Sequence, residues 1–154
     1  MNAGSITRRT ILRAGLLATV TLGLAGTTRG YAQGSAPMKI GISFNRQSMT
    51  ATLEDNPSAR DFASLLPLDD LSIDNYADNE KISYLPRKLT QEGSGPFGDE
   101  RAGDLCYYAP WGNLAFFYAS YRWSRGLIRL GRLDGGCEPL LIRGKFPLRI
   151  ARIA

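Results

Sequence analysis

Short segments in which apolar and polar residues alternate with a period of two recur through most of this chain, separated by glycine and proline residues. Such alternation places every second side chain on one face and predicts half-buried β-strands. The segments are 38–44, 49–53, 81–85, 104–108, 114–118, 126–133 and 148–153. The last is long enough to pair beside the first, which would remove both free edges of the sheet. We therefore expect a mainly β fold, a small closed β-barrel with one or two short helices.

Two segments after the opening pair of strands have other patterns. Asn56 can cap a short helix that begins at Pro57 and ends before Pro67, because apolar residues recur there at helical spacing. Residues 69–80 contain five acidic residues and no basic one. Acidic residues four apart would repel one another along a helix face, so we expect a solvated loop here. The spacing of the acidic residues in this segment does not match a calcium-binding EF-hand loop.

The first 32 residues resemble an export signal. Arg8 and Arg9 precede a short apolar run of moderate hydrophobicity, as in the twin-arginine signals that bacteria use to export folded proteins. The run is shorter than the roughly 20 residues that span a bilayer, so we expect no permanent membrane anchor. Small residues at Gly30 and Ala32 predict cleavage after Ala32. The expected organisation is a signal peptide at 1–32, a linker at 33–37 and a barrel domain at 38–154, located in the periplasm after passage through the twin-arginine machinery.

The positive charge of the chain belongs mostly to this signal. The formal net charge is +5, but residues 1–32 hold four of the 19 basic residues and no acid, which leaves 15 basic and 14 acidic residues. A nearly neutral body cannot supply the phosphate contacts of a nucleic-acid-binding domain, so no nucleic acid partner is expected. The chain has no histidine, which excludes histidine-based catalysis and imidazole metal sites. We expect no metal and no cofactor.

Cys106 and Cys137 leave two alternatives open. They could form a disulfide in an oxidising periplasm, or they could remain two buried thiols that pack as small apolar groups. Folding in the reducing cytoplasm before export favours the thiols. The sequence alone does not determine the distance between the two residues.

A glycine-rich motif at 93–98 matches the letters of a nucleotide-binding fingerprint, G-x-G-x-x-G. Pro96 removes a backbone N–H where phosphate binding needs donors, and no apolar helix follows the motif. We therefore expect an ordinary loop.

The residues best suited to binding a ligand lie between 103 and 118, where six of 16 residues are aromatic. A turn at 110–113 interrupts this run and would place Tyr108 and Trp111 at a barrel rim, with Asn113 beside them. This arrangement predicts the wall of a binding pocket.

Three strings in this chain together resemble bacterial cyclophilin-like fold proteins. They are YLPRKL at 84–89, GDL with YYAPWGN between 103 and 113, and SRGLIRLGR at 124–132. The resemblance extends from about Met38 to the C-terminus. It implies a closed cyclophilin-like β-barrel with a helix packed against it and a groove on its outer face.

Cyclophilins isomerise X-Pro bonds with an arginine flanked by aromatic, glutamine and histidine side chains. Because this chain lacks histidine and its body glutamines lie outside the matched strings, we assign no catalytic residue. Arg87 or Arg125 beside Trp111 could bind a peptide carbonyl or a small carboxylate.

Our leading hypothesis is a non-catalytic barrel that binds a small molecule or a peptide. The expected ligand-binding residues are Arg87, Tyr108, Trp111, Asn113 and Arg125. A peptidyl-prolyl isomerase with an incomplete active site is the alternative. A structural or interaction subunit, suggested by the arginine-rich last strand, is a third possibility, and the oligomeric state is left open.

Overall fold

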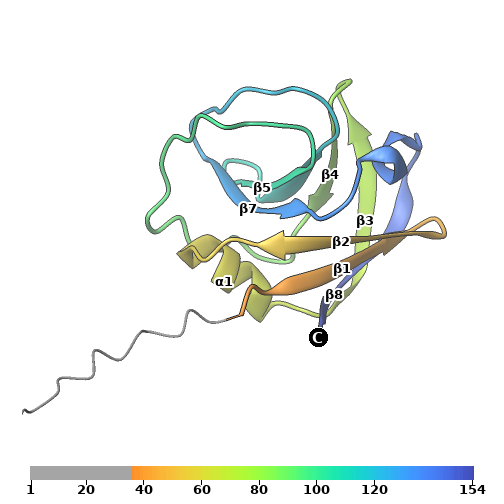
Figure 1. The fold of residues 1–154 in the computed structure, drawn as a ribbon, viewed down its shortest axis with the longest axis horizontal. Coiled ribbons are helices and arrows are strands. Elements are labelled where there is room, and N and C mark those ends of the chain that lie inside the picture. The colour runs from red at the N-terminus through yellow and green to blue at the C-terminus, as the bar shows by residue number, and fades with distance from the viewer. Residues whose placement is uncertain (1–35) are drawn as a thin grey trace, which may run out of the picture. The chain divides into compact units, whose positions relative to one another are not determined.

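Eight antiparallel strands close into a barrel in the part of the chain that the computed structural model describes, residues 36–154 (Figure 1). The strands are β1 (Lys39–Phe44), β2 (Gln47–Leu53), β3 (Leu68–Tyr76), β4 (Glu80–Tyr84), β5 (Asp104–Tyr108), β6 (Asn113–Phe117), β7 (Leu127–Leu133) and β8 (Phe146–Ile153). Around the barrel their order is β1-β2-β7-β5-β6-β4-β3-β8. One α-helix, α1 (Pro57–Ser64), and one short 3₁₀ helix, η1 (Glu138–Leu141), complete the described secondary structure. The expected mainly β, closed barrel is confirmed.

The barrel closes where the last strand meets the first. β8 pairs with β1 over six residue pairs, with Ile42 opposite Ile150, and the two strands lie side by side in Figure 1. A tight turn at Asn45 and Arg46, with φ values of 41° and 59°, joins β1 to β2 in the predicted hairpin. Both positive values suit a two-residue turn that follows the right-handed twist of its strands.

Apolar side chains from alternate strand positions fill the barrel interior, as the period-two pattern predicts. Ile40 and Ile42 of β1 are completely buried against Leu148 and Ile150 of β8. The helix α1 begins at the expected cap, because the Asn56 side chain accepts a hydrogen bond from Ala59 N at 2.8 Å. Its buried face joins the same apolar cluster as the barrel interior.

The acidic segment 69–80 is not a loop, and this prediction was wrong. Residues 68–76 form β3, which pairs with both β8 and β4. Leu71 and Ile73 point inward while Ser72 and Asp74 are exposed, so the carboxylates lie on the wet face of a strand. Strand pairing satisfies the backbone without bringing these acids together as a helix would. Among residues 36–154 there is no cluster of three or more potential metal ligands.

The two cysteines are free thiols, so of the two alternatives for them the disulfide is not formed. Cys106 points to the outside of the sheet, into an apolar cluster separate from the barrel interior, whereas Cys137 packs against the interior cluster. The two thiols thus lie on different sides of the barrel wall. Burial raises the pKa of the Cys106 thiol to about 12.

The predicted signal peptide at 1–32, with Arg8, Arg9 and cleavage after Ala32, lies outside the described residues, as does linker segment 33–35. The glycine-rich motif at 93–98 lies in the loop between β4 and β5, with no helix after it. Within residues 36–154, none of the helices has the length and hydrophobicity that crossing a membrane requires.

Gly131 provides a test of barrel closure. β2 and β7 pair over only three positions, and Gly131 faces Leu53 at the end of this short seam. A Cβ at Gly131 would overlap the Thr52 carbonyl oxygen and lie 2.9 Å from Leu53 Cα, both backbone atoms. We expect Gly131→Ala to lower the free energy of unfolding by about 2 kcal/mol or more, measured by urea denaturation.

Gly135→Ala is the matched control, because nothing lies within 4 Å of a Cβ at Gly135. Its stability should stay within about 0.5 kcal/mol of the wild type. Equal stability of the two variants would contradict the close strand approach described here.

Candidate functional site

β6 is buried along its whole length, on both faces. Leu114 and Phe116 point into the barrel, while Ala115 and Phe117 point outward into a second apolar cluster. This outer cluster also contains Cys106 and Leu127 and is packed by Phe97, Tyr108, Tyr121 and Trp123. A strand that is apolar on both faces needs cover on both. The cover outside the barrel comes from two loops, residues 85–103 and 118–126.

A buried carboxylate ties these loops to the sheet. The Asp104 side chain is completely buried, and its Oδ1 accepts a hydrogen bond from Arg132 Nε at 2.6 Å. Its Oδ2 accepts from the Tyr121 hydroxyl at 2.6 Å and from Arg101 N at 3.2 Å. Burial raises the pKa of Tyr121, so this hydroxyl remains a proton donor.

Two arginines of β7 add further contacts between this network and the 85–103 loop. Arg129 and Arg132 both pair with Asp99, at 2.8 Å each, and hold its pKa down at about 2. The Arg129 guanidinium also lies over the Phe97 ring, 4.7 Å from its centroid. Trp123 N donates to Glu100 Oε1 at 2.8 Å, and the two loops run side by side in Figure 1. The outer cover is therefore held by charge as well as by apolar contact.

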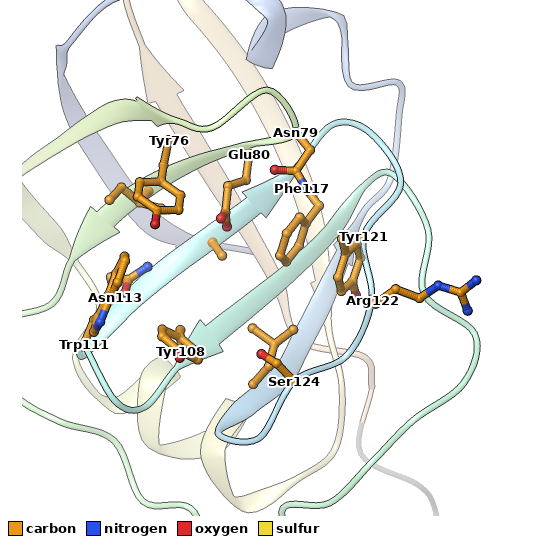
Figure 2. A pocket seen from close by; sticks show the side chains of 13 residues that line it. Tyr76, Asn79, Glu80, Tyr108, Trp111, Asn113, Phe117, Tyr121, Arg122 and Ser124 are labelled. Carbon is orange, nitrogen blue, oxygen red and sulfur yellow. The ribbon is translucent and has the colours of Figure 1, made fainter.

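The cover is incomplete, and it leaves a cavity of about 300 Å³ on the outer face of β4, β6 and β5 (Figure 2). At one end, Trp111 stands edge to face with Tyr76 and Tyr108, with ring centroids 5.2 and 5.5 Å apart and planes near perpendicular. At the other end, Phe117 and Tyr121 are stacked with centroids 3.6 Å apart. Trp111 and Tyr76 remain 47% and 42% exposed, so solvent reaches these rings.

Of the residues described, 36–154, Glu80 is the one carboxylate that lines this cavity, and Figure 2 shows it directed into the cavity. On the sheet it lies between Tyr76 of β3 and Phe117 of β6, the residues paired with it on either side. Within residues 36–154 no basic side chain pairs with it, and burial alone raises its pKa to about 7. The site thus contains a carboxyl group that changes charge near neutral pH.

Asn113 is the second polar group without a full set of partners. It is 2% exposed, and its Nδ2 donates to the Leu114 carbonyl oxygen at 2.9 Å. Its Oδ1 is buried and has no hydrogen-bond partner. A buried acceptor without a donor is costly, so a site with one favours a ligand that supplies the donor.

The structure brings together three of the five residues expected to bind a ligand. Tyr108, Trp111 and Asn113 line the same cavity. Arg87 does not: its Nη2 lies 2.6 Å from Asp61 Oδ1 of α1, in an ion pair away from the cavity. Arg125 lines a different, larger and more open hollow of about 560 Å³. Both arginines lie in the covering loops, whose paths the strand pattern could not predict.

Sequence reasoning missed Tyr76, Glu80, Phe117 and Tyr121. Tyr76 and Glu80 belong to the hairpin of β3 and β4. The sequence predicts a loop at 69–80, and a loop gives no basis for assigning side chains to a face. The pattern along β4 gives the wrong face: Ile82 lies outward with Glu80, while Lys81 and Ser83 are the buried residues of this strand. Phe117 is apolar, and its outward position depends on the cover that the loops give to the second face of β6.

Comparison with known proteins agrees with this architecture. Residues 42–151 match the model of the cyclophilin-like family. Among solved structures, the chain is similar to the solution structure of a hypothetical protein from Archaeoglobus fulgidus, with a TM-score of 0.54 and 15% identity over 79% of this chain and 99% of that one. At this identity the similarity shows the fold alone. No curated protein matches the chain.

The raised pKa of Glu80 predicts how stability depends on pH. Between about pH 4.5 and 7 the folded state binds more protons at this carboxyl than the unfolded state does, so the free energy of unfolding falls as pH rises through this window. Above pH 7 the folded state holds an unpaired carboxylate. We expect Glu80→Gln to be more stable than the wild type by about 1 kcal/mol at pH 8, a value reduced for solvent screening.

At pH 4 the same variant should match the wild type, because Glu80 is then protonated in both states. Urea denaturation at the two pH values measures the difference. Glu92→Gln, at an exposed position in the 85–103 loop, is the control and should show no such pH dependence. A Glu80→Gln variant less stable than wild type at pH 8 would show that the carboxylate has a partner in the fold.

Proposed function

The chain belongs to the cyclophilin-like family, and on that basis we propose that it binds a small molecule or a peptide side chain in the aromatic cavity on the outer face of its barrel. The observation that carries the proposal is the pairing of exposed aromatic rings with an unsatisfied buried acceptor. Trp111 and Tyr76 leave much of their surface in water, and Asn113 Oδ1 lacks a donor beside them. Both features are unfavourable in the free protein and are relieved by a bound ligand.

The cavity is also formed in advance. Asp104, Arg132 and Tyr121 fix one wall, and the stacked pair of Tyr121 with Phe117 closes that end. A volume of about 300 Å³ lies at the lower limit of small-molecule sites. We infer a ligand, or a ligand group, no larger than one or two rings.

The geometry supports binding better than prolyl isomerisation. The arginine that lines the cavity is Arg122, and Figure 2 shows its guanidinium directed away from the cavity. Arg87 is engaged with Asp61, and Arg125 lines a different hollow. In the part of the chain that the structure describes, none of these three arginines is directed toward the aromatic rings of the cavity.

Binding is tested by ¹⁵N-detected titration of the two tryptophan indoles with a library of small cyclic fragments. We expect fragments to shift the Trp111 indole N–H. The Trp123 indole N–H, which donates to the Leu127 carbonyl oxygen at 3.0 Å, is an internal control and should hardly move. Trp111→Leu should weaken each hit by about tenfold or more, the effect of losing a well-packed aromatic contact.

A library with no effect on Trp111, or one that shifts only Trp123, would contradict the proposal. A proline-peptide isomerisation assay tests the alternative, and we expect no acceleration. Catalysis abolished by Arg122→Ala or Arg125→Ala would favour the isomerase.

We further propose that the protein is exported to the periplasm by the twin-arginine route and cleaved after Ala32. Residues 1–32, with Arg8 and Arg9 before an apolar run, support this. Cleavage there would leave the strands intact, because β1 begins at Lys39. We expect the periplasmic fraction of a bacterial host to contain a chain that begins at Gln33, identified by mass spectrometry, and Arg8→Lys with Arg9→Lys to retain the precursor in the cytoplasm. Export of that double variant at the normal level would exclude the route.

A further inference from the structure

Resting on the proposed function, we propose that the cavity selects a protonated amine, whose ammonium group donates hydrogen bonds to Glu80 and Asn113 while its apolar body lies among Tyr76, Tyr108 and Trp111. The inference concerns the chemical class of the ligand. It follows from three separate properties of the cavity.

The first property is a pair of hydrogen-bond acceptors without protein partners. Some donors at the cavity are already engaged by the protein: Asn113 Nδ2 donates to Leu114 O, and the Tyr121 hydroxyl donates to Asp104. Asn79 Nδ2 likewise donates to Ser120 O, at 3.3 Å. Within residues 36–154, the Glu80 carboxylate has no basic partner and Asn113 Oδ1 has no hydrogen-bond partner. A ligand that brings N–H donors can satisfy both acceptors.

The second property is the arrangement of the aromatic rings. Trp111 is nearly perpendicular to both Tyr76 and Tyr108, with interplanar angles of 88° and 78°. Trp111 and Tyr76 also remain well exposed, and exposed π faces attract cations. A carboxylate beside such rings adds a full negative charge.

The third property is that none of the cations described around the cavity, within residues 36–154, is directed into it. Lys81 follows Glu80 in sequence but lies on the opposite face of β4, where its Nζ donates to Asn75 Oδ1 and Gly144 O inside the barrel. Arg122 points away from the cavity. Asp74 and Asp78, from β3 and the turn after it, are exposed near this edge and add negative potential.

The charge of Glu80 makes binding pH-dependent. The other titratable or charged groups that line the cavity are Tyr76 of β3, Tyr108 of β5, and Tyr121 and Arg122 of the 118–126 loop. Burial raises the pKa of Glu80 to about 7, so protonation of this carboxylate is the event that should weaken amine binding as pH falls.

The test compares three probes of one shape: benzylammonium, neutral benzyl alcohol and benzoate. We expect benzylammonium to bind the full chain at pH 8 with a Kd at least tenfold below that of benzyl alcohol, followed at the Trp111 indole N–H and by calorimetry. Benzoate should bind most weakly. At pH 6, where benzylammonium is still protonated, its affinity should fall by up to about tenfold, the loss expected one pH unit below a pKa of about 7.

Glu80→Gln keeps the shape of the side chain and removes its charge. We expect the preference for benzylammonium over benzyl alcohol, and its pH dependence, to disappear in this variant, whose folding is checked by its ¹⁵N spectrum. Glu92→Gln removes an equal charge outside the cavity and should retain both.

The outcomes separate this inference from the function on which it rests. Benzyl alcohol or benzoate binding at Trp111 as tightly as benzylammonium would overturn the amine while leaving a binding cavity. An unchanged preference in Glu80→Gln would overturn the role of the carboxylate. If neither these probes nor any library fragment shifts Trp111, the binding function itself is wrong, and the inference falls with it.

Discussion

The structure depends on one constraint, which is that β6 is apolar on both faces. Leu114 and Phe116 can be removed from water only by a closed barrel, whereas Ala115 and Phe117 need a second cover on the outside. Each large apolar side chain that becomes fully buried contributes about 2 kcal/mol, so neither face can be left open without loss of stability. The two covering loops are therefore part of the fold, and the cavity is the part of the outer face that they do not reach.

The buried carboxylate of Asp104 determines where the covering loops end on the outer face of the sheet. Asp104 is completely buried, and a carboxylate in such a position is tolerated only when its oxygens are well paired. Arg132 and Tyr121 meet this need, which fixes Tyr121 over Phe117 and stops the loop there. The end wall of the cavity is thus positioned by the need to pair a buried carboxylate at the start of β5, opposite Arg132 of β7.

The sequence predicted the parts of the fold that local alternation determines. Seven of the eight strands and the Asn56 cap could be recognised, and Tyr108, Trp111 and Asn113 were grouped because they are neighbours in the chain. β3 was missed because its carboxylates outweighed the alternation of Leu71 and Ile73. Glu80, Tyr121 and the true positions of Arg87 and Arg125 depend on strand order and loop paths, which are long-range properties that local patterns do not contain.

Two adjacent charged residues of β4 lie on opposite faces of the strand and differ in how well their charges are paired. Lys81 is fully buried in the barrel, where burial lowers its pKa, yet it has two oxygen acceptors and lies about 6 Å from the Phe44 and Phe146 rings. Glu80 is also removed from much of its water but has no such partners among residues 36–154. Since the barrel can satisfy a buried charge at one position of this strand, the unsatisfied carboxylate at the next is not imposed by the topology. A group that the fold leaves without a partner, facing outward among aromatic rings, is open to a partner from solution.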